Sequence, residues 1–138
     1  MFITETRRIV FPSVRQNINI IEKLVNELTD FYNIGDEHYA NILVALSEAV
    51  TNAMEHGNKL ADDKMVEVNF ETRGSSLCFT IKDEGNGFDP TTLPDPTDPS
   101  RLEIPGGRGV FIMQKLSDKM EVLDNGRKIE LYFNLTNQ

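Results

Sequence analysis

The sequence has little cysteine and no long apolar run. Its single cysteine, Cys78, cannot form an internal disulfide, and no Cys/His cluster has the spacing of a zinc site. No stretch approaches the roughly 18–20 apolar residues that a membrane-spanning helix needs. Residues 1–12 lack the apolar segment of a secretory signal. We therefore expect a cytoplasmic protein that does not contact membranes.

Positive charge is also scarce. The 138 residues include 14 Lys and Arg against 22 Asp and Glu, which gives a net charge of −8. The only basic doublets, Arg7-Arg8 and Arg127-Lys128, fall in expected strands. A surface of this sign repels nucleic acid unless a local basic patch overrides it. We expect no direct nucleic-acid binding and a partner that is a protein or a small ligand. The length is usual for one domain, so we expect a single domain at 1–138.

Hydrophobic periodicity and turn residues predict an α+β fold. We expect strands at 4–11, 65–73, 76–83 and in a hairpin at 119–135, and helices at 13–32, 37–56 and from 106. Ser13 and Asp36 are the expected N-caps, Gly57-Asn58 ends the second helix, and Asn125-Gly126 indicates a type I′ turn. This order favours a mixed, mostly antiparallel sheet with about three helices on one face. Residues 84–105 contain five of the six prolines and predict a long functional loop.

The second expected helix carries two different faces. In "LSEAVTNAMEHGNK", Leu46, Val50 and Met54 form an apolar stripe with the preceding Leu43, and Glu48, Asn52 and His56 fall nearly opposite. Ala45, Ala49 and Ala53 lie along the flank of that polar line. Taken alone, this pattern is compatible with a solvated helix face or with a face directed at a ligand.

Two glycine-rich segments follow. In "IKDEGNGFD", Asp83 precedes Gly85 and Gly87, where a carboxylate and open backbone could receive a flat base, although Asn86-Gly87 is also ordinary turn chemistry. In "PGGRGVFIM", glycines open a helix, and helix N-termini attract phosphate. The second segment is neither a Walker A loop nor a dinucleotide fingerprint, and each segment alone is a weak signal.

The three motifs together resemble those of the GHKL ATPase superfamily, which has the Bergerat nucleotide-binding fold. Within it, the sequence is most similar to the small anti-sigma factor serine/threonine kinases of bacteria. "EAVTNAMEHG" resembles the N box, "DEGNGFDP" the first glycine box and "GGRGVFIM" the second. The likeness covers almost the whole chain.

The resemblance implies a site for ATP and Mg²⁺. It implies that Glu48 is the catalytic base, that Asn52 binds Mg²⁺, and that Asp83 reads adenine. It implies further nucleotide-binding positions at Gly85, Gly87, Gly107, Arg108 and Gly109, with residues 88–105 as the ATP lid. His56 is not expected to be a phosphoacceptor, because in histidine kinases that residue belongs to a separate helical domain.

The resemblance also implies a function and its partners. We expect phosphorylation of a serine or threonine on a STAS-type anti-anti-sigma factor, binding of a sigma factor, and pairing of the chain as a homodimer. Two alternatives stay open. One is an ATP-binding module with little kinase activity, and the other is a GHKL domain with a partner other than sigma.

Overall fold

The structure is a computed structural model that describes residues 5–86 and 107–135. Its strands are β1 (Thr6–Pro12), β2 (Met65–Arg73), β3 (Ser76–Lys82), β4 (Lys119–Leu123) and β5 (Lys128–Asn134). Its α-helices are α1 (Ile18–Tyr32), α2 (Asp36–Asn52) and α3 (Gly107–Leu116). A 3₁₀ turn, Arg15–Asn17, precedes α1, and a π-helical turn, Ala53–Gly57, continues α2.

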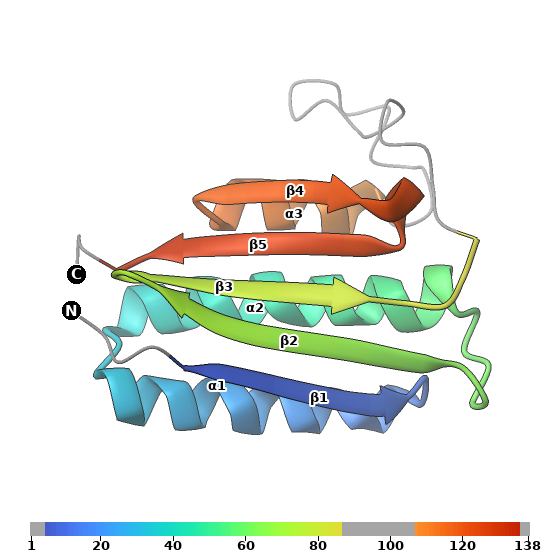
Figure 1. The fold of residues 1–138 in the computed structure, drawn as a ribbon, viewed down its shortest axis with the longest axis horizontal. Helices are drawn as coiled ribbons and strands as arrows, with labels where there is room; N and C mark the ends of the chain where they lie inside the picture. The colour runs from blue at the N-terminus through green and yellow to red at the C-terminus, as the bar shows by residue number, and fades with distance from the viewer. Residues whose placement is uncertain (1–4, 87–106, 136–138) are drawn as a thin grey trace.

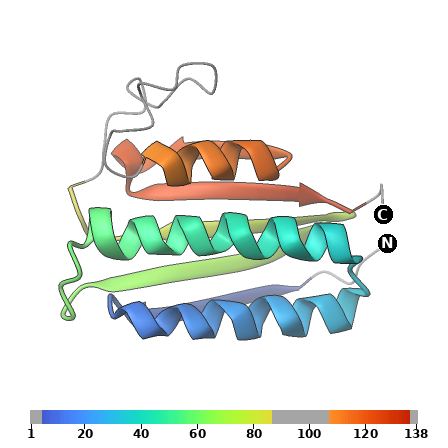
Figure 2. The ribbon, with the colours of Figure 1, turned by 180° about the vertical axis from the view of Figure 1, so that it is seen from behind.

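The described strands form one sheet in the order β1-β2-β3-β5-β4, and all four pairings are antiparallel. The three α-helices cover one face of this sheet (Figures 1 and 2). This arrangement agrees with the expected two-layer α+β fold. Among the described residues, no helix covers the other face of the sheet (Figure 1).

The core lies between the two layers. Along β2, inward-facing residues alternate with half-buried polar ones, as a strand with one covered face requires. Phe70, Phe79 and Phe133 come from β2, β3 and β5, and their rings pack in sequence at centroid distances of 5.2 and 5.9 Å. From α2, Leu46 and Val50 are buried as expected, as is Met54 in the π-helical turn, whereas Leu43 is only half-buried.

Two predicted N-caps are wrong. Ser13 does not cap a helix, since its hydroxyl donates to the Lys64 carbonyl and the 3₁₀ turn begins after Val14. The N-cap of α2 is Gly35, and Asp36 is the first helical residue, where its negative charge still favours the helix dipole.

The hairpin between β4 and β5 turns where expected, but not as a type I′ turn. Leu123 pairs with Lys128, so four residues connect the strands. Asp124, Asn125 and Gly126 have positive φ angles of 51°, 54° and 88°. The short polar side chains of Asp and Asn tolerate this left-handed conformation.

Candidate functional site

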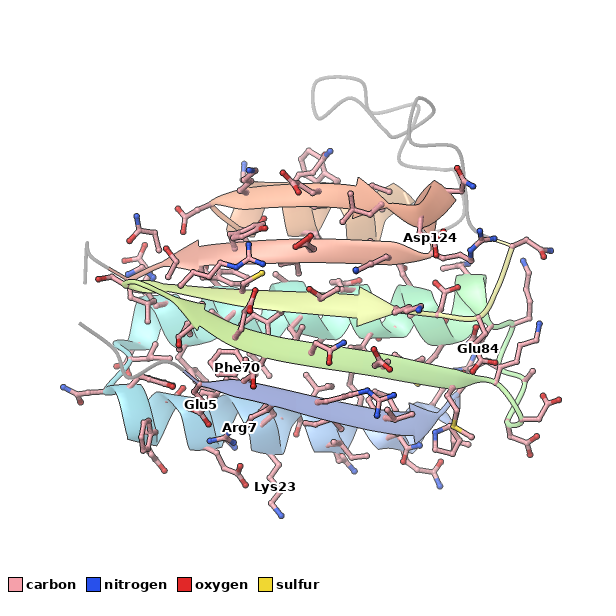
Figure 3. The ribbon with its side chains drawn as sticks, in the orientation of Figure 1. Glu5, Arg7, Lys23, Phe70, Glu84 and Asp124 are labelled. Atoms are coloured by element: carbon pink, nitrogen blue, oxygen red, sulfur yellow. The ribbon has the colours of Figure 1, made fainter. Side chains whose placement is uncertain are left out.

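The candidate site lies at one end of the molecule. The C-terminal end of α2, the end of β3 and the start of α3 meet at this end, as both views of the ribbon show (Figures 1 and 2). Figure 3 labels Glu84, just beyond β3, and Asp124, in the turn after β4, at the same end. Three segments far apart in sequence are therefore neighbours here.

The start of α3 lies directly against the polar line of α2. A Cβ atom at Gly109 would lie 2.8 Å from Asn52 Nδ2 and 3.0 Å from Glu48 Oε2. Only glycine permits this approach without moving those side chains. Glu48 and Asn52 are half-buried, while His56, the third member of the line, is exposed. The predicted line is therefore not one uniform face, because Glu48 and Asn52 meet α3 and His56 meets solvent.

The alanine row on the flank of that line has a packing role. Ala45, Ala49 and Ala53 are at most 5% exposed and belong to the buried core. A direct contact of these alanines with a ligand, which the sequence pattern left open, is therefore not supported.

The end of the π-helical turn packs against the Asp83 loop. A Cβ atom at Gly57 would lie 2.5 Å from Asp83 Oδ2, and one at Gly85 would overlap the Gly57 carbonyl oxygen. The turn is widened by a hydrogen bond from the Asn58 N–H to the Ala53 carbonyl at 2.8 Å. Such wide turns occur frequently at functional sites.

Asp83 is held firmly and is largely buried. Its backbone N–H donates to the Arg127 carbonyl at 2.9 Å, and its Oδ1 accepts from the Gly85 N–H at 2.8 Å. Burial raises the pKa of the Asp83 carboxyl above its ordinary value, and the Gly85 hydrogen bond and the charge of Arg127 oppose that rise. A buried carboxylate with one oxygen fixed by the backbone is suited to accept a hydrogen bond from a base.

The second glycine segment opens α3 as expected. Gly107 is the first residue of the helix and is buried, as is Gly109, whereas Arg108 between them is exposed. The N–H groups of this first helical turn and the positive end of the helix dipole suit a phosphate group. Gly87 and the expected lid at 88–105 lie outside the described residues.

The comparisons with known proteins agree with this geometry. The model of the histidine kinase-like ATPase domain matches residues 12–133. The chain belongs to this family. An anti-sigma F factor of Clostridium perfringens is 30% identical over 124 residues, which cover 85% of this chain and 79% of the relative. A serine-protein kinase RsbW of Bacillus pumilus is 29% identical over 122 residues, covering 83% and 75%. A protein of the same name from Oceanobacillus iheyensis is 23% identical over 117 residues, covering 80% and 74%.

Membership of the histidine kinase-like ATPase family confirms the resemblance, the fold class and ATP as the nucleotide.

Within the described ranges 5–86 and 107–135, no three His, Cys, Asp or Glu residues cluster as a metal site. No helix in those ranges is long and apolar enough to cross a membrane. The roles of the individual site residues stay predictions.

Sequence reasoning missed Asn58. The sequence pattern assigns it only to the end of the helix, but its side chain is fully buried and forms hydrogen bonds to three other segments. The local signal, a Gly-Asn pair after a helix, is common at helix ends and does not indicate distant partners.

Proposed function

We propose that this histidine kinase-like ATPase domain is an ATP-dependent serine/threonine protein kinase that acts as an anti-sigma factor. The observation that carries the proposal is the contact of Gly109 with Glu48 and Asn52. It brings an acid, an amide and a helix N-terminus to one place, which are the groups that phosphoryl transfer needs. The names of the relatives, anti-sigma F factor and serine-protein kinase, support the same function. The match over residues 12–133 supports one such domain for 1–138.

The residues present fit ATP and Mg²⁺. Glycine at position 109 brings the start of α3 into close contact with the Asn52 amide, and an amide oxygen suits a hard cation that takes its other ligands from phosphate and water. Asp83, with Gly85 and Gly87, is the proposed adenine site. Gly107, Arg108 and Gly109 are the proposed phosphate contacts. The nucleotide supplies the γ-phosphoryl group, and Mg²⁺ neutralises its charge.

The chain's own contribution is positioning and proton acceptance. Glu48 lies one helical turn before Asn52, and both side chains border Gly109. Glu48 would therefore be placed to accept the proton of a partner's hydroxyl, and the Asn52 amide would hold the metal. The N–H groups at the start of α3 stabilise the negative charge of the transferred group.

The proposed partners are a STAS-type anti-anti-sigma factor, which receives the phosphoryl group, and a sigma factor. Phosphorylation adds roughly −1.5 to −2 charges to the antagonist. The chain's net charge of −8 repels that product, so phosphorylation releases the antagonist. We also propose that the kinase is a homodimer in the cytoplasm.

The proposed function includes no direct binding of nucleic acid. Arg7 pairs with Glu5 at 2.6 Å and with Glu27 at 3.1 Å, and Arg8 pairs with Glu67 at 2.7 Å. The first basic doublet is thus neutralised by neighbouring acids. This pairing supports a protein partner over a nucleic acid.

The test is capture of partners followed by phosphorylation. The chain is immobilised with Mg²⁺ and either ATP or ADP, and the bound proteins are identified by mass spectrometry. Each captured protein is then incubated with ATP and the parent chain, with Glu48→Gln, or with Glu55→Gln as control. Glu55→Gln makes the same chemical change two helical turns later, where Glu55 pairs with exposed Arg15.

We expect a phosphoserine or phosphothreonine on one partner with the parent chain and with Glu55→Gln, and none with Glu48→Gln. A captured partner that stays unmodified would instead identify a binding module. Phosphorylation of a partner unrelated to sigma regulation would contradict the anti-sigma role alone.

A further inference from the structure

Asn58 is a fully buried amide whose polar atoms all have partners. Its relative exposure is 0%. The side-chain Nδ2 donates to Ser13 Oγ at 2.8 Å and to the Met65 carbonyl at 3.0 Å, and Oδ1 accepts from the Glu84 N–H at 2.8 Å. A buried amide with every group satisfied rigidifies its surroundings, since each lost partner leaves an unpaired polar group.

These bonds connect four segments at the site end of the molecule. Ser13 follows β1, Asn58 follows the π-helical turn, Met65 begins β2, and Glu84 follows β3. Ser13 is only 1% exposed, and its hydroxyl extends the network by donating to the Lys64 carbonyl at 2.8 Å.

The bond to Glu84 acts on the Asp83 loop. The Glu84 N–H belongs to the peptide group that joins Asp83 to Glu84, so Asn58 fixes the plane of that peptide. On the other side, the Asp83 N–H is fixed by the Arg127 carbonyl. Asp83 is therefore held by hydrogen bonds on both sides, one to Arg127, just before β5, and one to Asn58.

We propose that Asn58 is a positioning residue for base recognition, which sets the orientation of the Asp83 carboxylate through the Glu84 N–H. This inference rests on the proposed role of Asp83 in reading adenine. Asn58 acts through the loop and needs no contact with the nucleotide.

The experiment compares two Asn58 variants with a matched control in the same network. Asn58→Ala and the similarly sized Asn58→Leu remove the acceptor for the Glu84 N–H. Ser13→Ala removes a different partner of the same amide and leaves that acceptor in place. Calorimetry gives the affinities for Mg-ATP and Mg-GTP, and thermal unfolding gives the stability of each protein.

We expect all three variants to lose stability. Loss of a positioning hydrogen bond should lower the preference for ATP over GTP by about fivefold in the Asn58 variants, and Ser13→Ala should keep the parental ratio. A parental ratio in a folded Asn58 variant overturns the proposal but leaves the kinase function standing. A parent chain that binds no adenine nucleotide overturns both.

A second measurement needs no variant. The Glu84 amide of the parent chain should exchange with deuterium more slowly than the exposed Gly74 amide in the β2–β3 turn. Equally rapid exchange at Glu84 would show that the bond to Asn58 does not persist and would overturn the proposal even if neither Asn58 variant folds.

Discussion

Replacing Gly109 by alanine tests the contact on which the proposed site depends. The added Cβ would lie 2.8 Å from Asn52 Nδ2, 3.0 Å from Glu48 Oε2 and 3.1 Å from Asn52 Oδ1. Ordinary contact between heavy atoms is about 3.5 Å, so the closest approach is short by roughly 0.7 Å. The atoms that must yield are the ends of two flexible side chains rather than backbone.

The stability of Gly109→Ala should change little. Alanine gains up to about 1 kcal/mol over glycine inside a helix. Displacing the Asn52 and Glu48 side chains from their preferred rotamers costs about 0.5–1.5 kcal/mol each. These terms largely offset one another, so we expect the free energy of unfolding to remain within about 2 kcal/mol of the parent.

The activity of Gly109→Ala should fall far more. A misplacement of about 1 Å in a reacting geometry can lower a rate by about 100-fold. Displacements of roughly 0.7 Å at Asn52, the proposed metal ligand, and roughly 0.5 Å at Glu48, the proposed base, should therefore lower kcat for phosphoryl transfer by about 10- to 100-fold. Mg-ATP affinity should fall as well, because Asn52 is the proposed metal ligand.

The assays are calorimetry with Mg-ATP, phosphoryl transfer to the captured partner, and thermal unfolding. Gly74→Ala is the control, since Gly74 has a φ of 62° and open space around its Cβ position. It should lose about 1–2 kcal/mol of stability and keep its activity. Parental kcat and parental Mg-ATP affinity in Gly109→Ala would refute the site geometry.

Four further predictions concern single side chains. Glu48→Gln should bind ATP normally and lose at least about 100-fold in phosphoryl transfer, and an unchanged rate would exclude Glu48 as the base. Asn52→Ala should weaken ATP binding only when Mg²⁺ is present, and identical loss with EDTA would contradict a metal ligand. Asp83→Asn should lower the preference for ATP over GTP. Because burial raises the pKa of Asp83, the parent loses stability as pH rises through that pKa, so the unfolding midpoint of Asp83→Asn at neutral pH should match or exceed the parental one. The hydrogen bonds from Tyr32 and Arg7 lower the pKa of Glu5 from 4.5, so Glu5 stabilises the fold above that value and less as pH falls through its lowered pKa. Glu5→Gln should therefore reduce the loss of unfolding free energy as the pH falls on the acid side. An unchanged dependence of stability on pH would refute this.

The strands were predictable because their pattern is local. The alternation in residues 65–73 and the glycine at position 74 specify a hairpin without reference to the rest of the chain. The helix ends were less predictable. Ser13 has the residue type of an N-cap, but its hydroxyl donates to the Lys64 carbonyl, just before β2, and so does not cap the helix.

Some features of the candidate site could likewise be predicted from the sequence, and others could not. Glu48 and Asn52 could be selected from sequence because they belong to a contiguous motif with helical spacing. Their contact with Gly109 could not, because spacing within one helix does not say which other helix packs against it. The role of Asn58 was even harder to predict, because its partners Ser13 and Glu84 are 45 and 26 residues away in the sequence.

The π-helical turn joins the two halves of the candidate site. Asn52, the last residue of α2, contacts Gly109 on the proposed phosphate side, and Gly57, at the end of the turn, contacts Asp83 on the proposed base side. An uninterrupted α-helix would advance by 100° per residue between these positions. The wider turn changes the direction in which the following residues point around the helix axis. As a result, the Gly57 carbonyl contacts Gly85 and the Asn58 amide faces the interior. The single extra residue in the turn therefore lets one helix end reach both the proposed phosphate side and the proposed base side.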